Sequence, residues 1–161
     1  TASDNALLWE LLASGDIGMA STDHCPFILG QKLAEPTCFG AVPGVGGCEN
    51  SVSLLFSEGY QKGRLSLPQL AERLSGEAAR LYGLAPEKGA LMEGADADIV
   101  LIDPNAPRVL TAQKEHSNAE YSIWEGFRVG CTVRRVCLRG ELVSTGGEPV
   151  GSPNGKYLFA Q

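Results

Sequence analysis

The sequence predicts an α/β fold that contains the end of an α/β barrel and, after it, a smaller segment rich in strands. Three observations predict this fold. A short apolar segment at residues 16–20 is followed at once by a polar run at residues 21–27, and the catalytic groups of α/β barrels follow the carboxyl ends of the strands. Segments with helical periodicity flank this strand. Beyond about Pro86 the pattern changes to glycines and alternating residues, which is typical of strands.

The first element expected is an outer barrel helix at residues 4–14, with Asp4 as its cap and Gly15 as its stop. Its apolar stripe consists of Leu7, Leu8, Leu11 and Leu12. Residues 17–22 are small and apolar, as expected of a strand that is buried on both faces.

A loop is expected at residues 30–47, where glycines and prolines interrupt every apolar period. A helix is expected at residues 49–60, with Val52, Leu55 and Phe56 pointing inward. Residues 66–69 (SLPQ) resemble a capping box with proline in the first turn. They predict a helix to about residue 74, and a short helix at residues 77–82 follows.

We expect three parts: the end of the barrel at residues 1–86, strands and a connecting segment at residues 87–145, and a tail at residues 146–161. A strand is expected at residues 97–102 and a hairpin at residues 132–143, turning near Arg139 and Gly140.

Composition excludes several classes of protein. The net charge of −6, with scattered Lys and Arg, argues against a nucleic-acid partner. No apolar run approaches the ~20 residues that span a bilayer, and the first residues lack the features of a signal peptide, so a cytoplasmic protein without a membrane partner is expected. The five cysteines lack C-x-x-C spacing, which favours reduced thiols over disulfides or a zinc knuckle. The first residue is Thr1, and we expect the chain to be part of a longer reading frame.

Asp23, at the end of the expected barrel strand, allows three interpretations. It can be a helix cap or turn former. His24 can activate Ser21 or Cys25 as a nucleophile, although adjacent side chains on an extended segment point to opposite faces. In the third interpretation Asp23 is a metal ligand and general base. His24, whose side chain points the other way, then supports the ligand or the fold without binding the metal.

The third interpretation is strengthened by a resemblance to a known family along nearly the whole chain. The segments that carry it are STDHCPF (residues 21–27), LLFSEG (54–59), KGRLS (62–66), ARLYGL (79–84), the run at 88–100, and HSNAEY (116–121) followed by WEGF (124–127). In this order they resemble the C-terminal part of the cyclic amidohydrolases. The dihydropyrimidinase and hydantoinase branch is the most similar, and allantoinase and dihydroorotase are more distant.

The resemblance implies the end of a (β/α)8 TIM barrel and part of a small β-sandwich. It implies that Asp23 ligates one metal of a centre of two divalent ions, zinc being expected, and moves the proton during hydrolysis of a cyclic amide. The family's other ligands, an H-x-H pair, a carboxylated lysine and two further histidines, lie on earlier strands and are not in this sequence. We therefore expect residues 1–161 alone to be inactive, and the full-length enzyme to be a homotetramer or homodimer.

Pro43 and Gly44 fall where relatives offer backbone groups to the ring amide of the substrate. Many hydantoinases have Asn-Gly there, and proline lacks the backbone N–H, so an allantoin-like or other ring amide stays open. His116 is expected at a surface or subunit contact. Trp124, Phe127, Cys131 and Cys137 are expected to pack.

The function expected of the whole protein is thus hydrolysis of a cyclic amide such as a dihydropyrimidine or hydantoin. A non-catalytic assembly protein of the same fold, or an allantoinase or dihydroorotase type of enzyme, is the alternative. An independent binding module is disfavoured, because one barrel strand with its helices would leave unpaired edges and exposed apolar faces.

Overall fold

The computed structural model describes residues 1–159 and begins with helix α1 (Ala2–Ser14). Thr1, not Asp4, is its N-cap, because the Thr1 side chain accepts the backbone N–H of Asp4 while the Asp4 carboxylate accepts from Thr1. Asp4 is the other half of this capping box. Gly15 ends the helix with a φ of 97°, as expected. Leu12 is buried and Leu11 is half-buried, whereas Leu7 and Leu8 are each 53% exposed, so half of the predicted stripe is uncovered.

Residues 17–22 do not form the predicted strand. A strand requires a neighbour that accepts and donates its backbone hydrogen bonds, and no strand of the described chain lies beside this segment. Its hydrogen bond from Ala20 N–H to the carbonyl of Arg73 (3.0 Å) ties it instead to the helices.

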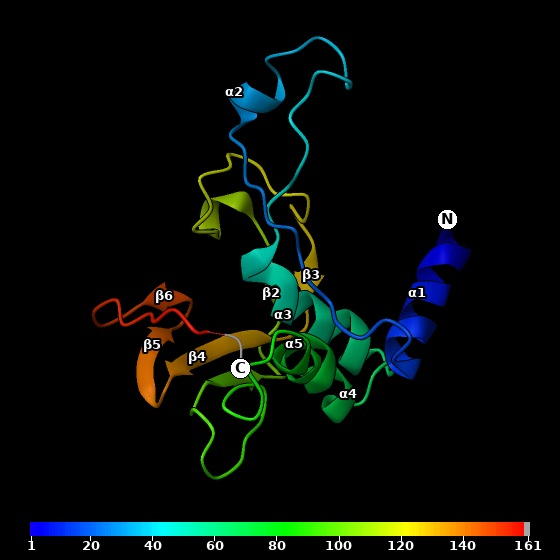
Figure 1. Cartoon of the computed structure of the whole chain (residues 1–161). Coiled ribbons are helices and arrows are strands. Elements are labelled where there is room, and N and C mark those ends of the chain that lie inside the picture. Colours follow the sequence, from blue (N-terminus) through cyan, green and yellow to red (C-terminus); the bar gives the residue numbers. More distant parts are fainter. Residues whose placement is uncertain (160–161) are drawn as a thin grey trace.

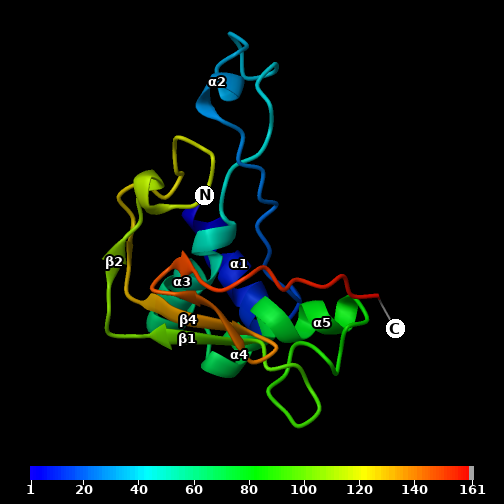
Figure 2. The same cartoon turned by 90° about the vertical axis from the view of Figure 1, so that its left-hand side faces the viewer.

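Residues 25–46 extend away from the body of the molecule as a long excursion (Figures 1 and 2). A loop was expected from residue 30, but the excursion contains one helical turn, α2 (Leu29–Lys32). The Gln31 side chain accepts the N–H of Ile28 (3.1 Å) and starts this turn. Local capping chemistry therefore produces a helix where the apolar pattern gives no signal.

Two irregular helical rods follow the excursion, the first at residues 48–61 and the second at residues 67–81. Ser66 begins the second rod as predicted, because its hydroxyl accepts the N–H of Gln69 and the Gln69 side chain accepts the N–H of Ser66 (2.8 Å). The first rod covers the helix expected at 49–60, and the second joins, without a break, the helix expected from the capping box at 66–69 to about residue 74 and the one expected at 77–82, ending at Leu81. The segments of the first rod are η1 (Cys48–Asn50), α3 (Ser51–Leu55) and η2 (Phe56–Gln61), and those of the second are α4 (Leu67–Ala71), η3 (Glu72–Gly76) and α5 (Glu77–Leu81).

The remainder forms two antiparallel sheets. The larger has the strand order β1-β4-β5-β6. The predicted hairpin is confirmed by β4 and β5, with Arg139 (φ 50°) and Gly140 (φ 82°) at its turn. The sequence did not predict β2, β3, β6 or η4. The bounds are β1 (Ile99–Asp103), β2 (Arg108–Val109), η4 (Ala112–Lys114), β3 (Arg128–Val129), β4 (Thr132–Leu138), β5 (Glu141–Thr145) and β6 (Glu148–Pro149). The division of the chain at residues 86 and 145 stays a prediction.

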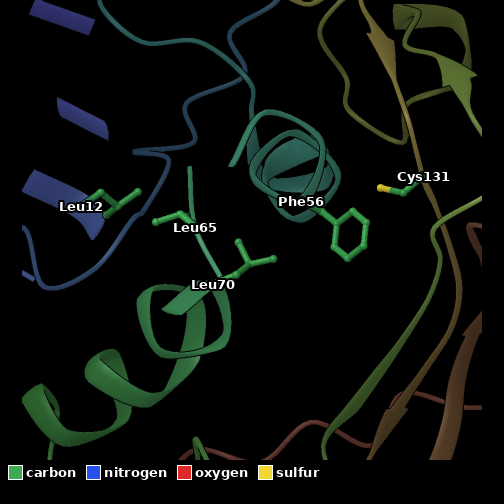
Figure 3. Close-up of a cluster of buried hydrophobic side chains, with 5 residues drawn as sticks. All are labelled: Leu12, Phe56, Leu65, Leu70 and Cys131. Atoms are coloured by element: carbon green, nitrogen blue, oxygen red, sulfur yellow. The ribbon is translucent and has the colours of Figure 1, made fainter. Parts of the chain in front are cut away.

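The main core lies where both rods, α1 and the sheet meet (Figure 3). Its buried members are Leu12, Phe56, Leu65, Leu70 and Cys131. Phe56 points inward as expected, while Val52 and Leu55 are half-buried. Cys131 lies between β3 and β4, and burial raises the pKa of its thiol, so it acts as a small apolar residue.

A second, smaller cluster packs Leu54 against Leu110 and Val129. Trp124 and Phe127 cover it, with their rings edge to face and 5.7 Å between centroids, which confirms the expected packing role. Within residues 1–159, no helix combines the length and apolarity that crossing a membrane requires.

Candidate functional site

Asp23 lies immediately after the extended segment at residues 17–22, and its side chain is exposed. Its φ is 45°, in the left-handed region that few residues other than glycine adopt. Asp tolerates this region better than most residues, and such conformations are concentrated at active sites and ligand-binding turns. The backbone therefore turns sharply at the residue that the sequence selected as its principal site candidate.

His24 turns back onto the end of the excursion. Its Nδ1 accepts the backbone N–H groups of Gly47 (3.0 Å) and Cys48 (3.2 Å). Accepting at Nδ1 leaves the proton of the neutral ring on Nε2. Because Nδ1 is occupied by the backbone, it does not activate Ser21 or Cys25, and His24 instead supports the loop beside Asp23.

The end of the excursion runs alongside the residues that follow Asp23. His24 and Val45 form a parallel β-bridge, and the N–H of Cys25 donates to the carbonyl of Val45 (3.0 Å). Gly44 is half-buried and Pro43 is exposed. The structure thus brings the predicted residues Asp23, His24, Pro43 and Gly44 into one region.

Gly44 is required by two features of this region. Its φ is 116°, and a Cβ at this position would clash with the Cβ of Cys25. We expect Gly44→Ala to displace the loop and to lower the free energy of unfolding by more than the ~1–2 kcal/mol that a Cβ costs in the left-handed region alone. Gly63→Ala is the matched control, since Gly63 has a φ of 71° with nothing within 4 Å. Equal losses in urea unfolding of the two variants would contradict the role of the contact with Cys25.

Lys32 is a residue of this region that the sequence did not predict. Its ammonium donates to the carbonyl of Val42 (2.6 Å) and to that of Gly44. No periodicity pairs a lysine with carbonyls ten and twelve residues later. The sequence offered one indication of this contact. A segment rich in Gly and Pro forms no regular helix or sheet, so its carbonyls need other hydrogen-bond donors, and a lysine in the same segment can provide them.

Asp23 offers a hard oxygen donor of the kind that divalent cations bind. One carboxylate does not hold a metal alone, and residues 1–159 contain no group of three or more His, Cys, Asp or Glu that could. The chemistry of the donor set therefore fits one ligand of a centre and not a complete centre.

A cavity of about 490 Å³ adjoins the segment that leads to Asp23. Its walls come from α1, from residues 20–22, from the end of the excursion, from the first helical rod and from residues 123–127. The lining residues closest in sequence to the site are Ser21, Thr22, Val45, Gly46 and Gly47, and the aromatic ones are Trp9, Trp124 and Phe127.

His116 lies at the surface, as expected, and joins segments that are far apart in sequence. Its Nδ1 lies 3.0 Å from Glu49 and its Nε2 lies 3.4 Å from Glu148, and its backbone N–H donates to Glu49 (2.8 Å). Hydrogen bonds to Glu49 and then to Glu148 raise the pKa of His116 above its usual 6.5. His116 lines a second cavity, of about 700 Å³, together with Lys114 and Glu115.

A histidine whose folded-state pKa is raised adds stability below its unfolded-state pKa, and this stability is lost as the pH rises through the folded-state value. We expect the melting temperature to fall over that window, from about pH 6.5 upward, and His116→Gln to flatten this part of the profile. An NMR titration of the His116 ring measures the pKa directly. Glu49→Gln should lower it, and an unshifted value in the wild type would contradict the contact.

A protein-family model with the description "Amidohydrolase family" matches residues 2–143 of this chain. The D-phenylhydantoinase of Escherichia coli O1:K1 / APEC is 40% identical over 154 residues, which are 94% of this chain and 33% of that protein.

Among solved structures, the D-hydantoinase (dihydropyrimidinase) from Thermus sp. is similar with a TM-score of 0.87 and 37% identity, over 91% of this chain and 32% of that one. The L-hydantoinase (dihydropyrimidinase) from Arthrobacter aurescens has a TM-score of 0.88 and 32% identity, over 94% of this chain and 34% of that one. The chain thus spans about a third of the length of the relatives it matches.

Proposed function

Because this chain belongs to the amidohydrolase family, we propose that it is the C-terminal part of a hydrolase that opens a cyclic amide, with Asp23 as its catalytic residue. The observation that carries the proposal is the position of Asp23. It is an exposed carboxylate held at a φ of 45°, and the next residue, His24, contacts the backbone of Val45, Gly47 and Cys48. The similar proteins with hydantoinase names support the same class of substrate.

Hydrolysis of a cyclic amide adds water across one ring C–N bond: the carbonyl carbon gains a hydroxyl and the nitrogen gains a proton. In the proposed role, the Asp23 carboxylate accepts a proton from the attacking water and delivers it to the leaving nitrogen. The Asp23 residue is exposed, so its carboxylate is accessible to substrate and water. The neighbouring His24 holds the loop so that Asp23 and the backbone beside it keep one geometry.

The proposed enzyme uses two divalent ions, zinc being expected, which when bound polarise the carbonyl and lower the pKa of water. Asp23 is the one residue of this chain that we assign as a metal ligand. The remaining ligands would come from outside the described residues.

The proposed substrates are hydantoin-type or dihydropyrimidine-type rings. The backbone at Pro43 and Gly44 is proposed to meet the ring amide. Pro43 provides a carbonyl but no N–H, so this position can accept a hydrogen bond from a ring N–H and cannot donate one to a ring carbonyl. We expect this polarity to influence which ring is preferred.

The test is a ring-opening assay on the purified product of the complete reading frame. Hydantoin, 5-phenylhydantoin, dihydrouracil, allantoin and dihydroorotate are offered in parallel, before and after removal of metal with a chelator. We expect opening of at least one of the first three, its loss on chelation and its recovery with added zinc. A folded product with its metal bound that opens none of the five rings would instead favour a non-catalytic assembly protein.

A further inference from the structure

Lys32 is the half-buried residue of an otherwise exposed stretch at the tip of the excursion, residues 29–40. It ends the single turn of α2 and reaches back across the excursion to the returning backbone. Its ammonium also lies 5.7 Å from the centroid of the Phe27 ring, a distance at which a cation is attracted to an aromatic face. One side chain therefore links the outgoing and returning arms of the excursion.

The two carbonyls that Lys32 binds belong to Val42 and Gly44, the residues on either side of Pro43. Hydrogen bonds from a charged donor are stronger than those between neutral groups. Because both bonds come from one ammonium, they restrict the rotation of the Val42–Pro43 and Gly44–Val45 peptide units, one just before Pro43 and one just after Gly44. Pro43 itself has a fixed φ and no N–H with which to anchor the loop.

A second set of contacts holds the same loop on its other side. The N–H of Cys25 donates to Val45, and His24 accepts from Gly47 and Cys48. These contacts anchor residues 45–48 to the residues that follow Asp23, but they leave residues 42–44 without a partner in the body of the molecule. Among the hydrogen bonds of the described chain, those from the ammonium of Lys32 anchor that part, and Gly44 also packs against Cys25.

We propose that Lys32 is a positioning residue for ring binding: its ammonium sets the backbone at Pro43 and Gly44 against Asp23. This inference rests on the proposed function and deepens it, because it assigns the orientation of the substrate loop to a side chain outside the catalytic group. With a neutral side chain at position 32, the two carbonyls are free to rotate and the loop adopts more conformations. In fewer of these conformations is the backbone at Pro43 and Gly44 placed to bind the ring amide, so substrate binding is weaker.

The experiment compares Lys32→Met, Lys32→Arg and the control Lys62→Met in the product of the complete reading frame. Lys62 is an exposed lysine that pairs with Glu58 at 2.6 Å and has no other ion pair within residues 1–159, so its replacement changes the charge equally without touching the excursion. Steady-state ring opening is measured together with metal content and with hydrogen exchange of the amides at residues 41–48.

We expect Lys32→Met to raise KM by about 10- to 100-fold, the loss of one to two charge-assisted hydrogen bonds, with kcat and metal content close to wild type. A rise in KM at constant kcat indicates lost ground-state binding and not a damaged catalytic group. Exchange at residues 41–48 should quicken, Lys32→Arg should recover most of the KM, and Lys62→Met should match the wild type.

Two outcomes would overturn the inference while the proposed function stands: an unchanged KM in Lys32→Met, or a joint loss of kcat, metal and fold that Lys32→Arg does not rescue. If the wild type opens no ring and amide exchange is nevertheless faster in Lys32→Met, the proposed function and the role of Lys32 in ring binding are both refuted. The anchoring of the loop by Lys32 would still stand. Unchanged exchange would refute the anchor itself.

Discussion

Asp23→Asn should lower kcat for ring opening by about 10²- to 10⁴-fold, the contribution typical of a general acid or base. Asparagine has nearly the same shape as aspartate and also tolerates a positive φ, so the turn at this position, with its φ of 45°, should be preserved. The amide cannot accept the proton that the carboxylate would carry. Stopped assays on the product of the complete reading frame, with metal content measured alongside, give the effect.

Asp16→Asn is the matched control for this prediction. Asp16 is also an exposed carboxylate just after α1, and it accepts a hydrogen bond from the Ser14 hydroxyl (2.6 Å). The change in charge is the same, yet Asp16 lies before the extended segment and not after it. If Asp23→Asn kept kcat within a few-fold of the control with metal fully bound, Asp23 would not be the proton carrier.

The largest effect on stability is expected from Phe56→Ala, with a loss of about 3–5 kcal/mol in the free energy of unfolding. Phe56 is 5% exposed and lies among Leu65, Leu70 and Cys131, where the helices meet the sheet (Figure 3). Its ring also packs on that of Tyr60, with 5.1 Å between centroids. Removing the ring leaves a cavity that elements on several sides cannot fill by one local shift. The midpoint of urea unfolding measures the loss.

Phe39→Ala provides the comparison, because Phe39 is 97% exposed at the tip of the excursion. The same atoms are removed, but they leave no cavity, and the midpoint should stay close to wild type. Similar shifts for the two variants would mean that the cluster around Phe56 is not the core that holds this part of the protein together.

Features that depend on neighbouring residues were predictable from the sequence. The capping box at Ser66 and Gln69, the stop at Gly15 and the turn of the β4 and β5 hairpin each involve groups within four residues of one another. Backbone geometry alone brings such groups together. The choice of Asp23 used local information of the same kind, a polar run directly after an apolar segment, which is the pattern expected where a barrel strand ends; its role stays a proposal.

The errors follow from the same limit. The segment at residues 17–22 has the composition of a buried strand, but strand formation requires a partner, and the described chain places none beside it. The stripe on α1 was correctly recognised as apolar, yet Leu7 and Leu8 are half-exposed because no other element of the described chain covers them. The composition of a segment indicates which kind of element it can pack against. It does not indicate whether a neighbouring strand or helix is present in the fold.

The sequence by itself determined α1, the two helical rods, the hairpin, the family resemblance and the choice of Asp23, because these rest on local periodicity, capping chemistry and ordered motifs. Only the tertiary structure decided that His24 holds the backbone of Gly47 and Cys48, that Lys32 binds the carbonyls beside Pro43, and that His116 contacts Glu49 and Glu148. These contacts join groups 10 to 67 residues apart. Their formation depends on the path of the whole chain, which no local pattern encodes.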